Sequence, residues 1–182
     1  MQNPRVENGI SILTDDLGCA RRINARNVTV RDTGHDRGRG IFAARGFLPG
    51  EVVMIGLLNR LEKARTTHSI EIDWNVHALF EEPPVFVNHS CDPNLAIVAN
   101  RFRAYDFIAV REISPDVELT WDYATSEFES IAVPVCLCAA ANCRQAAGGF
   151  STLPPIIHCS WPASMHPISN ETVDSSGGLL QR

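Results

Sequence analysis

Residues 86–94 read FVNHSCDPN and follow the apolar, proline-rich segment LFEEPPV at 79–85. The apolar segment predicts a buried strand, with Phe86 and Val87 as strand core. Asn, His, Ser and Cys side chains form hydrogen bonds, and His and Cys also bind metals. Several such groups directly after a strand indicate a functional site at a bend of the chain.

The overall composition is that of a folded protein. The 182 residues are 45% hydrophobic and 20% charged, which predicts one globular domain with short flanking segments. No apolar run reaches the length of a membrane helix, and the N-terminus lacks the layout of a secretory signal. We therefore expect a soluble, intracellular protein without membrane contact.

The charge is distributed unevenly along the chain. The net charge is −5, with an excess of basic residues in 1–65 and an excess of acidic residues in 66–182. An acidic second half favours a cationic substrate, although on charge alone a solvated acidic surface is the simpler explanation. No basic stripe with interleaved aromatic residues is present, so direct nucleic-acid binding is not predicted.

Alternation of apolar and polar residues predicts many short strands, for example in HSIEIDWNV at 68–76. Helical periodicity is weak, and LNRLEKA at 58–64 is the best short helix candidate. The segment 151–182 is rich in Pro, Ser and Gly and has the composition of a tail. The sequence therefore predicts a compact, mainly β domain.

Three cysteines are crowded into CLCAAANC, at Cys136, Cys138 and Cys143. Thiolates from one tight loop suit a tetrahedral Zn²⁺, and a closed structural site needs a fourth ligand. Unliganded thiols are the alternative, because reduced cysteines also serve as small buried hydrophobes. The residues that qualify as the fourth ligand are Cys19, Cys91, Cys159, His89 and His158.

A glycine pair, Gly38 and Gly40, lies in DRGRGIFA and forms part of a G-x-G-x-x-A pattern with Ala43. A dinucleotide-binding loop would need a preceding strand and a following helix, and neither is predicted here. The glycines instead indicate either an ordinary turn or a place where the backbone approaches a ligand closely.

In order, GRGIFA, PGE, FVNHSCDPN, ELTWDY and Cys-x-Cys-x4-Cys-Arg resemble the motifs of SET-domain proteins, lysine methyltransferases that use S-adenosylmethionine. The resemblance covers about Val28 to Phe150. It implies small curved β-sheets with a C-terminal pseudo-knot in which NHSCDPN meets ELTWDY, and a zinc-binding post-SET loop. The implied division is an N-terminal flank at 1–27, a SET domain at 28–130, the post-SET zinc loop at 131–150 and a C-terminal tail at 151–182.

The resemblance also implies roles for individual residues. Tyr123 corresponds to the active-site tyrosine, and Trp121 to the position that limits how many methyl groups are added; its bulk predicts monomethylation. The implied cofactor contacts, made by backbone and side chains, are Arg39, Gly40, Asn88, His89 and Leu137. The implied zinc ligands are Cys91, Cys136, Cys138 and Cys143.

The chain also departs from the family pattern. A second tyrosine early in the domain is missing, because Tyr105 is the only tyrosine besides Tyr123. The implied partner is a basic, histone-like protein tail or peptide, in the cytoplasm or the nucleus. Two alternatives stay open: a SET-fold enzyme acting on a small molecule, and a cofactor-binding module without catalysis.

Overall fold

The computed structural model describes residues 5–34 and 36–153, and within this part no helix is long and apolar enough to cross a membrane. In these described residues the helix α1 (Arg5–Asn27) precedes ten short strands. The strands are β1 Val28–Asp32, β2 Arg39–Ala43, β3 Val52–Ile55, β4 Leu58–Glu62, β5 Ile70–Asp73, β6 Val76–Phe80, β7 Asn88–His89, β8 Leu95–Ala99, β9 Tyr105–Ala109 and β10 Glu118–Trp121. The 3-10 helices are η1 Pro84–Phe86, η2 Tyr123–Thr125 and η3 Phe150–Thr152.

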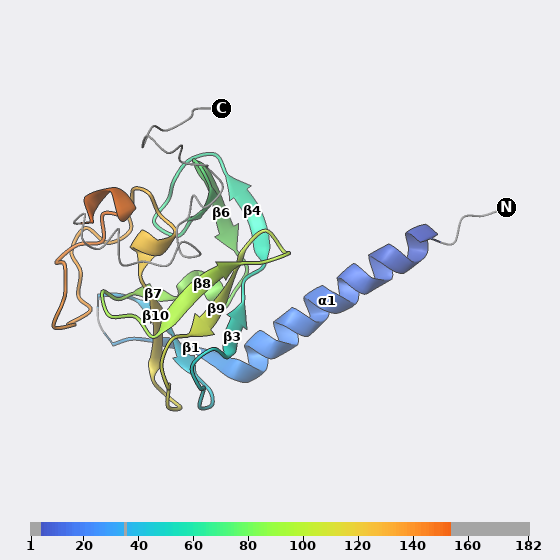
Figure 1. Cartoon of the computed structure of the whole chain (residues 1–182), viewed down its shortest axis with the longest axis horizontal. Helices are drawn as coiled ribbons and strands as arrows, with labels where there is room; N and C mark the ends of the chain where they lie inside the picture. Colours follow the sequence, from blue (N-terminus) through green and yellow to red (C-terminus); the bar gives the residue numbers. More distant parts are fainter. Residues whose placement is uncertain (1–4, 35, 154–182) are drawn as a thin grey trace, which may run out of the picture.

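The strands form three small sheets around one core (Figure 1). Their strand orders are β1-β2-β10-β7, β3-β9-β8 and β4-β6-β5. Ile41, Met54, Phe80, Phe107 and Leu119 are almost completely buried where the sheets meet. This arrangement confirms the predicted mainly β fold of small sheets.

The predicted meeting of the two motifs is confirmed by the pairing of β7 with β10. The strands are parallel, with Asn88 opposite Thr120 and His89 opposite Trp121. The Ser90 N–H continues this pairing by donating to the Trp121 carbonyl at 3.1 Å. The residues after β7 and those after β10 therefore leave the sheet from the same edge, which positions the candidate site.

The N-terminal flank is largely helical, which the weak periodicity of the sequence did not indicate. In Figure 1, α1 projects away from the sheets and only its C-terminal end meets them. Asn24 exchanges two hydrogen bonds of 2.8 Å with the backbone of Ile55, and the Asn27 amide donates to the Val53 carbonyl at 3.0 Å. These contacts attach the last helical turns to β3.

Three local predictions are wrong. The proposed helix at 58–64 is largely strand β4, because Leu58–Glu62 pairs with β6 and tertiary pairing overrides a short helical pattern. The single strand expected at 68–76 is a hairpin, because the chain turns at Trp74 and Asn75, whose φ is 54°. The buried strand expected at 79–85 ends with β6 at Phe80, and neither Phe86 nor Val87 lies in a strand, because the Pro83-Pro84 pair leads into η1, which Val87 caps.

Candidate active site and metal centre

Asn88, at the start of β7, links the glycine loop to β10. Its Nδ2 donates to the Arg39 carbonyl at 3.1 Å and to Oε1 of Glu118 at 3.0 Å. Glu118 also accepts two hydrogen bonds from the Arg37 guanidinium, at 3.1 and 2.7 Å. Both Asn88 amide hydrogens are thus used within the protein. The Asn88 Oδ1 makes no hydrogen bond with the described residues, and this oxygen is free to accept one from a ligand.

The two glycines of the loop are required for different structural reasons. Gly38 has a φ of +67°, in the left-handed region that L-residues avoid. A Cβ on Gly40 would lie 2.9 Å from Glu118 Oε1 and 3.1 Å from Asn88 Nδ2. Gly38 therefore permits the turn, and Gly40 permits the close approach of Glu118 and Asn88.

A large hollow of about 710 Å³ opens beside this loop. The predicted cofactor residues Arg39, Asn88, His89 and Leu137 line it. Gly40 follows directly in β2 and is not among the lining residues. The apolar side chain of Leu137, which also lines the hollow, is 50% exposed. The structure thus brings residues of the β2 loop, β7 and the cysteine loop together around one cavity.

The His89 imidazole turns away from solvent and into the protein. Its Nδ1 accepts a hydrogen bond from the Tyr123 N–H at 3.3 Å, and its Nε2 lies 3.3 Å from the Cys91 sulfur. Burial lowers the pKa of His89 to about 4, although the charge of Asp122 opposes this. The neutral ring therefore accepts at Nδ1, which assigns the proton to Nε2 and directs it at Cys91. Only the backbone of His89 remains for a ligand in the hollow.

Tyr123 stands in η2, directly after β10, and is half-buried. Its hydroxyl donates to the Val87 carbonyl at 2.9 Å. Burial, followed by the charges of Glu127 and Glu118, raises the pKa of Tyr123, so the phenol is neutral at ordinary pH. Because the O–H is committed to Val87, the oxygen lone pairs are left to accept hydrogen bonds from a ligand.

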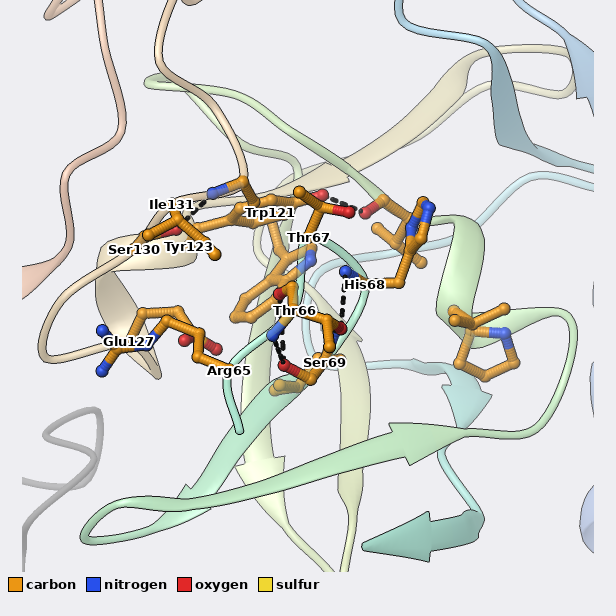
Figure 2. A pocket seen from close by; sticks show the side chains of 15 residues that line it. Arg65, Thr66, Thr67, His68, Ser69, Trp121, Tyr123, Glu127, Ser130 and Ile131 are labelled. Atoms are coloured by element: carbon orange, nitrogen blue, oxygen red, sulfur yellow. Dashed lines mark hydrogen bonds between the residues drawn. The ribbon is translucent and has the colours of Figure 1, made fainter. Parts of the chain in front are cut away.

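A second, much smaller hollow of about 30 Å³, called the narrow hollow below, also has Tyr123 in its lining. Figure 2 shows its labelled lining, with Trp121 and Tyr123 above Arg65 and Glu127. Trp121 is 3% exposed and packs on Tyr123 with ring centroids 4.9 Å apart. The wall shared by the two hollows consists of Thr67, His68, Val85, Val87, Tyr123 and Ala132.

The four predicted zinc ligands come together into one cluster. Their sulfur atoms all lie within 4.8 Å of one another, and the Cys91 and Cys136 sulfurs are 3.9 Å apart. Sulfurs about 2.3 Å from a tetrahedral ion would be about 3.8 Å apart, so the spacing fits one Zn²⁺. The backbone N–H of Arg144 approaches the Cys91 sulfur at 3.4 Å, as expected around thiolate ligands. Of the other candidate ligands, Cys19 is an exposed free thiol, whereas His158 and Cys159 lie outside the described residues.

An ion pair that the sequence did not reveal holds the cysteine loop against the sheet. Both terminal guanidinium nitrogens of Arg144, Nη1 and Nη2, donate to the buried Asp122 carboxylate, at 2.8 and 2.6 Å. Asp122 also accepts from the Ala124 N–H at 3.1 Å and caps η2. Asp122 directly precedes Tyr123, and Arg144 directly follows Cys143. The ion pair therefore couples the position of Tyr123 to that of the cysteine loop.

Comparisons with known proteins agree with this geometry. The family model "SET domain" matches residues 38–124. A probable histone-lysine N-methyltransferase set-23 of Caenorhabditis briggsae is 42% identical over 64 residues, which are 33% of this chain and 27% of that protein. The histone-lysine N-methyltransferase Set2 of Drosophila melanogaster is 33% identical over 133 residues, 62% of this chain and 6% of that protein.

Among solved structures, KRYPTONITE in complex with mCHH DNA, H3(1-15) peptide and SAH matches with a TM-score of 0.52 at 25% identity. The match covers 66% of this chain and 29% of that one. The chain thus spans less than a third of each of these relatives. The family match, the three small sheets and the pairing of β7 with β10 show a SET domain at residues 38–124 of this chain.

Proposed function

We propose that this chain transfers a methyl group from S-adenosylmethionine to the side-chain amine of a lysine in a basic protein tail. The observation that carries this proposal is the position of Tyr123 in the wall shared by two hollows. A large hollow suits a cofactor and a narrow one suits a slender aliphatic side chain. A phenol between them can align two groups that arrive from opposite sides.

The larger hollow fits S-adenosylmethionine in the chemistry of its lining. Asn88 Oδ1 is an available acceptor for the ammonium end of the cofactor, and the backbone at Arg39 and His89 offers further polar groups. The half-exposed Leu137 offers an apolar cover for the adenine. When bound, this cofactor supplies a methyl group on a positively charged sulfur.

The lysine in the narrow hollow must be a neutral amine to accept the methyl group. A free lysine with a pKa of about 10.4 is neutral in only about one molecule in 2,500 at pH 7. Burial beside Trp121 and Tyr123 lowers the pKa of an amine by desolvation. The Tyr123 oxygen, whose own proton is directed at Val87, would accept a hydrogen bond from the amine and orient its lone pair.

The cysteine cluster would hold a structural Zn²⁺ in this account. Cys91 follows β7, whereas Cys136, Cys138 and Cys143 lie in the loop that carries Leu137. One ion bound to all four sulfurs would tie this loop to the edge of the cofactor hollow. The metal therefore serves the methyl-donor site without taking part in the chemistry.

The acceptor class follows from charge and from the relatives. The acidic second half of the chain favours a cationic partner. Relatives that match this chain are named histone-lysine N-methyltransferases, and one matched structure contains an H3(1-15) peptide. A histone tail in the nucleus is thus our first choice of substrate.

The experiment that tests this function is incubation with methyl-labelled S-adenosylmethionine and core histones, followed by mapping of the label. We expect label on lysine. Cofactor binding without label on any protein would favour the small-molecule alternative, and failure to bind the cofactor would leave a module without catalysis.

Replacing Asn88 by Ala should weaken cofactor binding about tenfold, because it removes a hydrogen-bond acceptor for a charged group. Calorimetric titration with S-adenosylhomocysteine measures this effect. Asn94→Ala is the matched control, because Asn94 also bonds β10, through the Glu118 carbonyl at 2.8 Å and the Thr120 N–H at 2.9 Å, but lines neither hollow. Equal losses in the two variants would assign Asn88 a structural role.

The product should carry a single methyl group, because the Trp121 indole fills the space around the acceptor. Replacing Trp121 by Phe removes part of the ring and should raise the fraction of di- and trimethylated lysine, measured by mass spectrometry. Trp74→Phe, at a tryptophan that is 53% exposed and lines neither hollow, should leave the product unchanged. A trimethylated main product from the wild-type protein would contradict this assignment.

A further inference from the structure

A buried carboxyl group, Glu127, lies in the wall of the narrow hollow and has no part in the motifs discussed so far. Glu127 is 4% exposed and follows η2 by two residues. Its N–H donates to the Tyr123 carbonyl at 2.9 Å, which places the two residues one helical turn apart. Figure 2 shows Glu127 below Trp121 and Tyr123, at the same end of the hollow as Arg65.

The two oxygens of this carboxyl group have different surroundings. Oε1 accepts from the Glu71 N–H at 2.8 Å and from the Ser126 hydroxyl at 3.3 Å. Oε2 makes no hydrogen bond with the described residues, and unlike Arg65 Nε it is not a fully buried atom without a partner. Some of its surface is therefore accessible. The side chain is therefore anchored by one oxygen, and the other is left to face the hollow that Glu127 lines.

Glu71, on β5, provides a contrast. Both of its carboxylate oxygens accept backbone N–H groups, from Asn75 and Phe128, each at 2.9 Å. Glu71 is 4% exposed and does not line either hollow. A carboxylate with both oxygens bonded has a structural role, whereas Glu127 has an oxygen to spare at the position where an amine would enter.

Among the described residues, charged or titratable groups face Glu127 from several packed elements. They are Glu71 on β5, Tyr105 on β9, Tyr123 in η2 and Arg65 before β5, and His77 on β6 faces Glu71 and Arg65. Burial raises the pKa of Glu127 to about 7, assisted by the charge of Glu71 and opposed by hydrogen bonds and by Arg65. Near neutral pH both protonation states are therefore populated.

We propose that Glu127 is the amine-binding carboxylate of this hollow: Oε2 binds the alkylammonium group of the incoming side chain and then accepts one of its protons. The inference rests on the proposed function, because it deepens the assignment of the hollow to a cationic amine. In the proton transfer an N–H bond breaks, an O–H bond forms on Oε2, and the electron pair stays on nitrogen. The proton returns to solvent after the product leaves.

The proton transfer is favoured when the positively charged sulfur of S-adenosylmethionine is present, because that charge lowers the pKa of a nearby amine. In the complex with S-adenosylhomocysteine this charge is absent, and the amine stays bound as an ammonium ion beside the carboxylate. The Tyr123 lone pairs and Oε2 then lie around one amine, one orienting the nitrogen and the other removing its proton. Glu127 would thereby supply a group that compensates for the missing second tyrosine.

The Glu127→Gln variant tests whether Glu127 binds an amine or only supports β5 through its hydrogen bond to the Glu71 N–H. The amide oxygen can still accept from Glu71 and Ser126, so the variant keeps the anchor and loses only the charge. The probe is n-butylammonium, which mimics the end of a lysine side chain, titrated by NMR into the protein saturated with S-adenosylhomocysteine. Binding should be about tenfold weaker in Glu127→Gln, the loss expected for a charged hydrogen bond.

Glu129→Gln is the control, because it removes a neighbouring carboxylate that pairs with Arg65 at 3.4 Å but is exposed and lines neither hollow. It should bind n-butylammonium as the wild-type protein does. Wild-type protein that does not bind the probe, or a Glu127→Gln variant that binds it equally well, would overturn the assignment of Glu127.

A second measurement follows the carboxyl group itself. In protein with ¹³C-labelled glutamate carboxyls, the resonance lost in Glu127→Gln should titrate near pH 7, and n-butylammonium should shift its midpoint to lower pH, because a cation favours the carboxylate. A midpoint that the probe does not move would also overturn the proposal. Probe binding that depends on Glu127 in a protein that labels no lysine would instead retain the amine site and refute the proposed function.

Discussion

Replacing Tyr123 by Phe is expected to lower kcat about 100-fold, the scale of a lost alignment at the reacting centre. The affinity for S-adenosylhomocysteine should stay nearly unchanged, because the hydroxyl donates to Val87 and the cofactor hollow keeps its polar lining. The ring remains packed between His89 and Trp121, so the fold is retained. Single-turnover methylation of core histones, together with calorimetric binding, measures both quantities.

Tyr105→Phe is the matched control for this prediction. The Tyr105 hydroxyl also donates to a backbone carbonyl, that of Glu71 at 2.7 Å, but Tyr105 lines neither hollow. Each substitution should lower the free energy of unfolding by about 1 kcal/mol, the usual loss for one hydrogen bond. Only the Tyr123 variant should lose turnover. Equal activity losses in both variants would reduce Tyr123 to a structural residue.

Replacing Cys91 by Ser is expected to remove the metal and to detach the cysteine loop. We expect about one zinc per chain in the wild-type protein and a large loss of metal affinity in the variant, because hydroxyl groups bind zinc far more weakly than thiolates. Without the ion, the loop that carries Leu137 keeps the Arg144–Asp122 ion pair as its main anchor near the site. Cofactor affinity should therefore fall as well. Elemental analysis and calorimetric titration check the two effects.

Cys19→Ser controls for the loss of a thiol. Cys19 is exposed on α1 and lies outside the cluster, so this variant should keep its zinc and its cofactor affinity. A Cys91→Ser protein that retains a full equivalent of zinc would contradict the assigned ligand set. A variant that loses zinc but binds the cofactor normally would separate the metal centre from the donor site.

The two features that the sequence located best are those made by residues close together in short motifs. The pairing of Asn88–His89 with Thr120–Trp121 and the four-cysteine cluster both join segments that carry recognisable spacing. Each of those residues contributes a group whose chemistry is evident from its type, such as a thiolate or an amide. Residue type alone does not show which distant segments meet, and five residues therefore qualified as the fourth zinc ligand. The family resemblance selected one of them, Cys91.

Other features depend on tertiary contacts that no local pattern encodes. The local pattern of β4 indicates a short helix, because nothing in it shows the pairing with β6, a strand that comes later in the sequence. Glu127 looked like an ordinary acidic residue in an acidic region, and only burial beside Glu71 and Tyr123 distinguishes it. The Asp122–Arg144 pair joins residues 22 positions apart, and neither type of residue is unusual on a protein surface.

The most direct test of the central claim is a crystal structure of the protein with S-adenosylhomocysteine and the H3(1-15) peptide. We predict that the cofactor product occupies the large hollow beside Asn88 and Leu137, and that a lysine enters the narrow hollow beside Trp121. The lysine nitrogen should lie about 3 Å from the Tyr123 oxygen, a hydrogen-bond distance. A cofactor bound elsewhere, or a lysine that reaches the protein without entering the narrow hollow, would contradict the account.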